Sequence, residues 1–381
     1  MIDEAALTQR LDALIDASLG TKVVGAVVLV ARDGETIYVR AAGLADREAG
    51  RPVARDTIFR YASLTKPIVS AAALGLMEEG VIHLDDPVTR VLPDFRPKLA
   101  DGSEPVITFK HLMTHTSGLT YDFMEPPESA YHAREISNGF DVPGLSMAEN
   151  LRRIVAWPLN FAPGTGWNYS VGTDVLGAAL AAATGATLPE IVRRKVTGPL
   201  GMNDTDFSVT DPDRFAAAYA DGTPEPVRMG ERHSVPFMPS FLHYAPDRML
   251  DPASFPSGGA GMAGNAVDYL TFLEAIRTGG GTILAPHSAR LMLENAIGDI
   301  AVTATGPGYG FSLGGAILRD PKGAGTPQPA GTWSWGGVYG SSWFVDPVNR
   351  LTVVVITNTA IEGMVGAFTI GVRDAVYGVQ A

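Results

Sequence analysis

Two serines of this sequence lie in patterns that could make them nucleophiles, and the first is Ser63. In the stretch 61–67, read YASLTKP, Ser63 and Lys66 stand three residues apart. On a helix that spacing puts both side chains on one face, where the lysine amine can reach the serine hydroxyl. A serine with a lysine base one turn away is a known arrangement for nucleophilic catalysis. Lys66 is the only lysine that follows a serine at this distance, although a surface serine and lysine would also satisfy the pattern.

Pro67 predicts where the helix carrying this pair begins. Proline is tolerated in the first turn of a helix, where the backbone N–H groups have no partner in any case. Ser63 is therefore expected at or beside the helix start. There the positive end of the helix dipole and the free N–H groups favour developing negative charge.

The second serine is Ser312, in the stretch 310–314, read GFSLG, which matches the esterase pattern G-x-S-x-G. That pattern marks a nucleophile when a strand delivers the serine to a tight turn that opens into a helix. Here Gly314 and Gly315 follow, and then a short β-like run that ends at Asp320. The context predicts a glycine-spaced strand, and Ser312 is not expected to be the nucleophile.

Two further patterns are weaker than they look. Gly259, Gly261 and Gly264 are spaced as in a dinucleotide-binding loop, but the residues before them, DPASFPS, predict a loop and not the required strand. A glycine-rich loop before a helix capped by Asn265 explains them better. His111 and His115 stand four apart, yet the sequence lacks the H-E-x-x-H arrangement and offers no third ligand nearby, so no metal site is expected.

Two stretches could supply partners for Ser63 and Lys66. Tyr169 lies in GWNYS (166–170), after the turn formed by Pro163 and Gly164, where a tyrosine could carry a proton between lysine, serine and leaving group. A packed aromatic at a helix entry is the alternative. The stretch 334–340, read SWGGVYG, is expected in a carboxy-terminal sheet, where two glycines in a strand often let another backbone or a ligand approach closely.

The surrounding pattern predicts an antiparallel sheet assembled from both termini, with a helix-rich insertion between them. Two β-rich runs flank Asp33-Gly34, a strong hairpin signal, and a second hairpin is expected to turn at residues 346–349. Helices are expected at 68–79, 147–155 and 174–184, with a closing helix at 362–379. We expect an α/β domain formed by residues 1–75 and 205–381 and a mainly helical domain of residues 76–204, with the active site between them.

Composition excludes several classes of function. The 381 residues carry a net charge of −12 and no dense basic run, so nucleic acid and anionic membranes are poor partners. The absence of cysteine excludes disulfides and a cysteine nucleophile. The acidic amino terminus lacks the features of a secretion signal, and the longest apolar run, 23–31, is too short to span a bilayer. A soluble cytoplasmic protein is expected, with the oligomeric state left open.

Ser63-x-x-Lys66, Tyr169-Ser170 and Trp335-Gly336-Gly337, in this order and spacing, resemble the motifs of the serine β-lactamase and penicillin-binding-protein superfamily. Within it the chain is similar to family VIII carboxylesterases of the EstB-like kind, which share the class C β-lactamase fold. The phrases that agree are spread over nearly the whole chain: HLMTHTSGL (111–119), FAPGTGWNYS (161–170), SGGAGM (257–262) and WGGVYGSSWFVD (335–346).

The resemblance implies roles for particular residues. Ser63 would be the acylated nucleophile, and Lys66 and Tyr169 would share the general-base and general-acid work. The backbone N–H groups of Ser63 and Val338 would form the oxyanion hole. Tyr121 would line the substrate pocket, together with the three residues of the Trp335-Gly336-Gly337 motif. The implied fold has a central antiparallel sheet flanked by helices plus a helical domain, and no metal or organic cofactor is implied.

Two departures from the class C β-lactamases bear on the substrate. Their Tyr-x-Asn motif has Val171 at its third position here, and their Lys-Thr-Gly motif is replaced by Trp335-Gly336-Gly337. The missing lysine would have met the carboxylate of a β-lactam, whereas an indole offers a flat apolar wall. Trp335 is expected on the edge strand facing Ser63.

These observations favour a serine carboxylesterase that hydrolyses small, short-acyl, neutral esters through an acyl-enzyme on Ser63. The alternatives are a β-lactamase or D-amino-acid peptidase, and an acyltransferase in which an alcohol replaces water. A catalytically silent penicillin-recognising protein is disfavoured because every catalytic position is filled.

Overall fold

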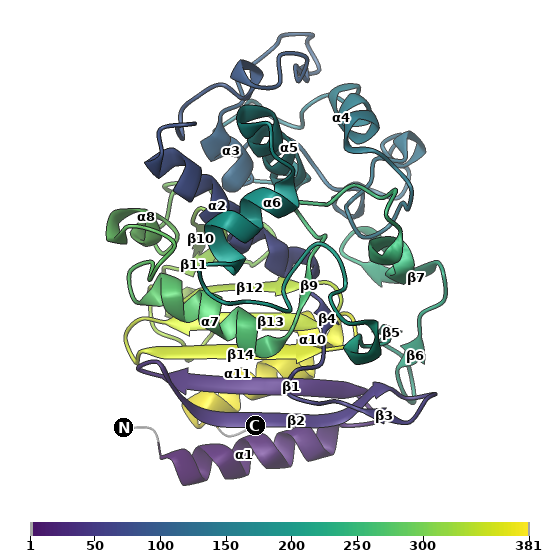
Figure 1. The fold of residues 1–381 in the computed structure, drawn as a ribbon, viewed down its shortest axis with the longest axis vertical. Helices are drawn as coiled ribbons and strands as arrows, with labels where there is room; N and C mark the ends of the chain where they lie inside the picture. Colours follow the sequence, from purple (N-terminus) through teal and green to yellow (C-terminus); the bar gives the residue numbers. More distant parts are fainter. Residues whose placement is uncertain (1–2, 380–381) are drawn as a thin grey trace.

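The computed structural model describes residues 3–379 and is built on one large antiparallel sheet, shown in Figure 1. Its eight strands lie in the order β10-β11-β12-β13-β14-β1-β2-β3, so the two ends of the chain meet where β14 pairs with β1. The predicted sheet built from both termini is therefore confirmed. The strands are β1 (Gly25–Arg32), β2 (Glu35–Asp46), β3 (Arg51–Pro52), β10 (Tyr309–Phe311), β11 (Ala316–Leu318), β12 (Trp333–Gly337), β13 (Ser341–Asp346) and β14 (Leu351–Thr357).

The central strands form because their sequences are dense in β-branched residues. β1 reads GAVVLVAR and β14 reads LTVVVIT, and both are buried along almost their whole length. The hairpin between β1 and β2 turns at Asp33 and Gly34, which both have positive φ (54° and 87°), as a tight two-residue turn requires. The second predicted hairpin is also present, since β13 ends at Asp346 and β14 begins at Leu351.

Helices cover both faces of the sheet. The amino-terminal α1 (Glu4–Ser18) and the carboxy-terminal α11 (Ala367–Tyr377) bury their apolar side chains, such as Leu11 and Val372, against one face. The opposite face packs against α7 (Ala266–Arg277) and the larger core, which continues into the helical part of the molecule. The site described below lies on that second side.

The helical part lies above the sheet in Figure 1. The predicted helices are present, and α5 ends as expected at Gly185, which has a φ of 71°. The helices of this part are α2 (Thr65–Glu78), α3 (Phe109–Met113), α4 (Met147–Val155), α5 (Gly172–Thr184) and α6 (Leu188–Val192); two short helices, α8 (Pro286–Leu291) and α9 (Pro321–Ala324), come later in the chain. The predicted boundaries of the two domains remain a prediction.

One predicted element is wrong in detail, because the closing helix is two helices. α10 (Glu362–Val365) ends at Gly366, whose backbone is extended, and α11 starts at the next residue. The Glu362 side chain accepts a hydrogen bond from the backbone N–H of Phe368 at 2.6 Å. A carboxylate at a helix start is favourable, and a Cβ on Gly366 would lie 2.5 Å from that carboxylate. The chain therefore breaks where it can cap the second helix.

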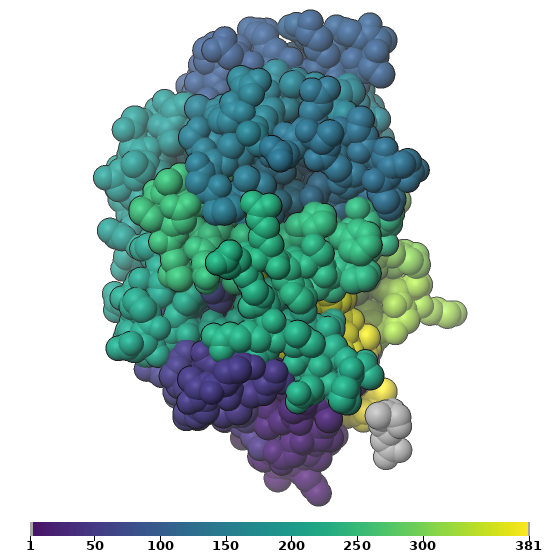
Figure 2. Space-filling model, turned by 90° about the vertical axis from the view of Figure 1, so that its right-hand side faces the viewer, coloured from purple at the N-terminus to yellow at the C-terminus, as the bar shows by residue number. Residues whose placement is uncertain are grey.

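Short two-stranded pieces connect the large elements. They are β4 (Phe59–Arg60) with β9 (Ala263–Gly264), β5 (Tyr219–Ala220) with β6 (Val227–Arg228), and β7 (His233–Phe237) with β8 (Ser240–Tyr244). Figure 2 shows the green middle segment of the chain spread over one side of the molecule, between the blue helical part and the purple amino-terminal part. Among the described residues no single helix is long and apolar enough to cross a membrane; α5 with 188–197 reaches that length only as a pair bent by 84°.

Candidate active site

Ser63 lies in a short 3₁₀ turn (Ala62–Leu64) that leads directly into α2. Pro67 is the third residue of α2, so the helix begins where the proline predicts. Ala62, immediately before the serine, has a φ of 46° although it carries a side chain. Such a conformation costs of the order of 1 kcal/mol or more and persists only where the surroundings enforce it. The chain thus holds the serine in a strained turn at a helix start.

The structure brings Ser63, Lys66 and Tyr169 into direct contact. The Lys66 Nζ lies 3.0 Å from the Ser63 Oγ, and the Tyr169 hydroxyl donates to the same oxygen at 2.6 Å. All three are buried, with exposed fractions of 5%, 3% and 7%. A serine oxygen that two titratable groups contact at once has both a proton acceptor and a proton donor within reach.

Burial sets the ionisation of this group. It lowers the pKa of Lys66 to about 7, against the attraction of the Asp174 carboxylate, which raises it. A lysine with that pKa is partly a neutral amine near neutral pH, as a general base must be. Burial raises the pKa of Tyr169, and the hydrogen bonds with Ser63 and Trp335 oppose that rise. The two groups therefore favour a neutral amine beside a protonated phenol.

Sequence reasoning missed the residues that hold Lys66. The Lys66 Nζ donates to the backbone oxygen of Gly259 at 2.8 Å. The Asp174 carboxylate lies near the start of α5 and accepts from the Ser257 hydroxyl and from the Gly259 N–H (3.2 Å). The glycine-rich loop that resembles a dinucleotide-binding pattern is thus the support of the lysine. Gly258 cannot carry a side chain, because a Cβ there would lie 2.4 Å from the Thr173 backbone oxygen.

The prediction that Trp335 lies on the edge strand is wrong. β12 is the third strand from the edge, with β11 and β10 outside it. However, β11 pairs only with Trp333 and Ser334, so the end of β12 that carries Trp335 extends beyond its neighbour. That end packs on the turn that carries Ser63, and a Cβ on Gly337 would lie 2.3 Å from the Tyr61 backbone oxygen. The glycine allows the close approach of two backbones, as predicted for this motif.

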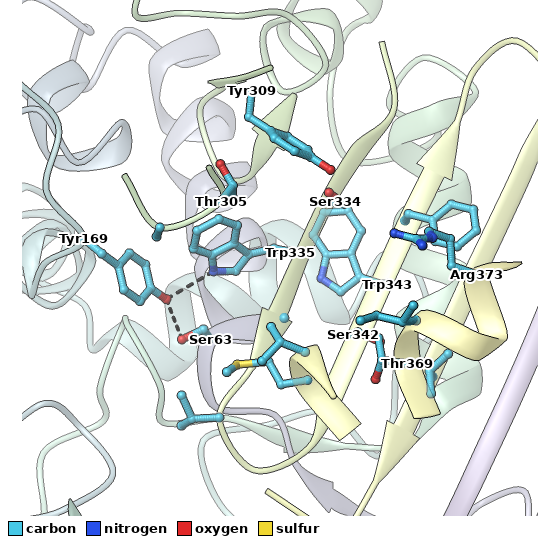
Figure 3. Close-up of a pocket in the computed structure, with 18 of the residues that line it drawn as sticks. Ser63, Tyr169, Thr305, Tyr309, Ser334, Trp335, Ser342, Trp343, Thr369 and Arg373 are labelled. Atoms are coloured by element: carbon cyan, nitrogen blue, oxygen red, sulfur yellow. Dashed lines mark hydrogen bonds between the residues drawn. The ribbon is translucent and has the colours of Figure 1, made fainter. Parts of the chain in front are cut away.

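Trp335 is more than an apolar wall. Its indole Nε1 donates to the Tyr169 hydroxyl at 3.1 Å, and its ring packs edge-on against those of Tyr169 and Phe311. Figure 3 shows the chain of hydrogen bonds from Trp335 through Tyr169 to Ser63. A donor aimed at the tyrosine oxygen stabilises negative charge on it.

A cavity of about 460 Å³ opens in front of Ser63. Trp335, Gly336 and Val338 line it together with Ser63, and the Tyr244 hydroxyl anchors the Val338 carbonyl at 2.9 Å. An oxyanion hole from the N–H groups of Ser63 and Val338 remains a prediction. The lining also includes the apolar side chains of Phe123, Met124, Phe237 and Met238.

Two residues predicted to bind substrate do not line this cavity. Tyr121 is 1% exposed, and its ring lies against those of Phe123 and Tyr169, with the Lys66 Nζ 5.2 Å from its centre. It therefore packs against Tyr169 and Lys66 and does not line the cavity. Gly337 is likewise turned towards the Tyr61 backbone. The motif contributes Trp335 and Gly336 to the cavity, and Gly337 to the packing.

The remaining candidates have structural roles. Ser312 follows β10 in the turn to β11, fully buried, and its hydroxyl donates to the Gly315 backbone oxygen at 3.1 Å. No helix follows it, as expected. His111 accepts from the Thr108 N–H in a helix cap, and His115 contacts the Ser170 hydroxyl at 3.2 Å. Within residues 3–379 no three histidine or acidic side chains are grouped so that they could hold a metal ion.

Comparisons with known proteins agree with this geometry. The Beta-lactamase family model matches residues 11–373. Esterase EstB of Burkholderia gladioli is 51% identical over 380 residues, which cover 99% of this chain and 96% of that protein. The lovastatin esterase of Penicillium rubens is 27% identical over 377 residues, 90% of each chain.

A solved structure described as "EstCE1, a hydrolase with promiscuous acyltransferase activity" superposes with a TM-score of 0.95 at 43% identity, covering 99% of this chain and 100% of that one. The fold expected from the motifs is confirmed by this match. The chain belongs to the Beta-lactamase family, as a serine hydrolase of the family VIII carboxylesterase type.

Proposed function

We propose that this protein is a serine carboxylesterase that hydrolyses small neutral esters through an acyl-enzyme on Ser63. The observation that carries the proposal is the buried Ser63 Oγ, which Lys66 and Tyr169 both contact at the floor of an apolar cavity. The 51% identity to an esterase supports the reaction class. A cytoplasmic location, expected from the sequence, is part of the proposal.

In the first step the neutral Lys66 amine takes the hydroxyl proton of Ser63 while the Oγ attacks the ester carbonyl carbon. The carbonyl oxygen becomes an oxyanion, which the N–H groups of Ser63 and Val338 would stabilise. When the tetrahedral intermediate collapses, the Tyr169 hydroxyl gives its proton to the departing alkoxide. The tyrosine oxygen, held by the Trp335 N–H, then regains a proton from Lys66.

In the second step water attacks the acyl-enzyme. The same basic groups take its proton, the Ser63 Oγ leaves with a proton, and the acid is released. An alcohol that replaces water in this step would give acyl transfer. We keep that as a second candidate, because the similar EstCE1 is described as having promiscuous acyltransferase activity and because the cavity is mostly apolar.

A β-lactamase or D-amino-acid peptidase is disfavoured by the same site. Val171 is 1% exposed and brings no polar group to the position where β-lactamases have asparagine. Arg373 is the only charged residue that lines the described cavity, and it lies on α11, away from the serine. Apart from Lys66, which the reaction needs as a neutral amine, a carboxylate next to the reacting carbonyl would therefore find no cation.

The experiment that tests the proposal combines an active-site phosphonate with a panel of chromogenic esters and a chromogenic cephalosporin. Labelling at Ser63, together with turnover of short-chain esters and slow cephalosporin opening, is expected. Tyr169→Phe should reduce kcat/KM by about a hundredfold or more, as for other positioned acid–base groups. Absence of labelling would instead indicate a silent binding protein.

A further inference from the structure

The cavity that begins at Ser63 continues to the other face of the sheet. Successive residues of a strand face opposite sides, so Trp335 and Gly336 belong to different faces. Trp335 packs against the larger core, whereas Phe344 and Val355 belong to the core under α11. All four line the same cavity. In Figure 3 Thr369 and Arg373 lie beyond the strand that carries Trp335, on the side away from Ser63.

The open end of β12 is what allows this passage. β11 pairs with Trp333 and Ser334 and stops there, so no strand covers this side of Trp335. Met364 of α10 packs directly on Gly336, because a Cβ on Gly336 would lie 2.7 Å from the Met364 Cγ, and both residues line the cavity beside this open end. From β12 to β14 the strands that line the cavity extend over two strand spacings, about 10 Å. An extended substrate arm that follows this lining passes from Trp335 to the end that carries Arg373.

The far end carries the one charge of the cavity. Arg373 is the only charged residue that lines it among the described residues, in a chain whose net charge is −12. Its side chain is 26% exposed, and its Nε and one Nη share a single oxygen of Asp374 at 2.8 and 2.7 Å. Within residues 3–379 the other Nη has no hydrogen-bond partner, so the guanidinium keeps a donor for a ligand. The hydroxyl of Thr369 stands on the same helix.

The hydrogen bonds at Tyr169 decide whether the alcohol arm or the acyl arm of an ester occupies the rear of the cavity. In the proposed reaction the Tyr169 hydroxyl protonates the leaving alcohol, so the alcohol oxygen must lie beside it. The Trp335 indole contacts that hydroxyl and lines the cavity at the open end of β12. The alcohol arm therefore departs along Trp335, towards Gly336 and the rear face.

We propose that the rear of this cavity is a binding site for an alcohol arm that has an apolar stem and ends in a carboxylate held by Arg373. The apolar side chains of Phe344, Val353 and Val355 cover the stem. The inference rests on the proposed esterase function. It separates two positions for a negative charge. Beside the reacting carbonyl a carboxylate is disfavoured, whereas at the Arg373 end of the cavity it is recognised.

The test compares two acetate esters that differ only at the end of the alcohol. One is octyl acetate, and the other is the acetate ester of ω-hydroxyoctanoate. We expect Arg373→Gln to raise KM for the anionic ester about tenfold, as for a partly exposed charge-assisted hydrogen bond, and to leave octyl acetate within about twofold. Arg373→Lys should keep part of the preference. Arg290→Gln is the matched control, since Arg290 is an exposed residue of α8 outside the cavity.

Direct binding gives a readout that does not depend on turnover. Calorimetry should show that ω-hydroxyoctanoate binds to the Ser63→Ala variant. The double variant that carries both Ser63→Ala and Arg373→Gln should not bind it. Equal binding by both proteins, or an equal KM for the anionic ester in Arg373→Gln, would overturn the inference. An effect seen only with monoethyl suberate, whose charge is on the acyl arm, would also overturn it. Ser63-dependent turnover of 4-nitrophenyl acetate tests the esterase function separately, so the two failures are distinguishable.

Discussion

Replacing Trp335 by phenylalanine should slow the reaction by removing one hydrogen-bond donor from the site. Phenylalanine keeps an aromatic ring against Phe311 and Tyr169, but it loses the N–H that donates to the Tyr169 hydroxyl at 3.1 Å. In the resting enzyme this bond involves a neutral phenol. During the reaction the same oxygen gives up its proton to the leaving alkoxide, and the N–H then faces a negative charge.

The size of the effect follows from that difference. A hydrogen bond between neutral groups contributes about 1 kcal/mol, and one to a charged group about 1.5 to 3 kcal/mol. The bond is therefore stronger in the transition state by about 0.5 to 2 kcal/mol. At about 1.4 kcal/mol for each factor of ten, Trp335→Phe should lower kcat by about twofold to thirtyfold. KM for a small ester should change less, because an interaction that strengthens only in the transition state affects kcat.

The assay is steady-state hydrolysis of a short-chain chromogenic ester as a function of pH. Losing the donor also raises the pKa of Tyr169, so any alkaline limb that reports its ionisation should move to higher pH. Trp167→Phe is a matched control, because Trp167 stacks beside Tyr169 while its indole N–H is buried without a hydrogen-bond partner in the described part of the chain. An unchanged kcat in Trp335→Phe, or an equal loss in both variants, would refute the reasoning.

Three further predictions concern the nucleophile, the base and the substrate. Ser63→Ala should abolish ester turnover while the melting temperature is kept. Ser312→Ala should keep most of the activity and lose about 1 kcal/mol of stability with its buried hydrogen bond, and acyl-enzyme mapped to the Ser312 peptide would contradict this. The pH profile of kcat/KM should rise through about pH 7 as Lys66 loses its proton. Asp174→Asn removes the charge that raises the pKa of Lys66, so the rise should move to lower pH; a limb that stays in place would count against the pairing. A cephalosporin with an exposed acetyl ester should lose acetate with its ring intact, as product masses would show, and Trp335→Lys should shift the preference only weakly towards anionic substrates.

The local elements could be predicted because their signals lie within a few residues of sequence. Asp33-Gly34 predicts its hairpin, Pro67 predicts the start of α2, and the β-branched runs of β1 and β14 predict buried strands. Ser312 could be excluded as the nucleophile from local sequence as well, because the residues that follow it do not predict a helix. A periodic pattern could not reveal the break at Gly366, because the cap that causes it depends on how Glu362 folds back.

The order of Ser63, Lys66, Tyr169 and Trp335 along the chain indicated the reaction class, because these motifs resemble those of the serine β-lactamase and penicillin-binding-protein superfamily. Only the tertiary structure decided what surrounds them. Asp174 and Gly259 meet at Lys66 from segments 85 residues apart, so no local pattern could predict that they support the base. The Trp335 indole donates to Tyr169, and Tyr121 turns away from the cavity, because of packing between distant segments. The path to Arg373 exists because β11 stops one residue short of Trp335, a property of strand pairing that the sequence of either strand alone does not contain.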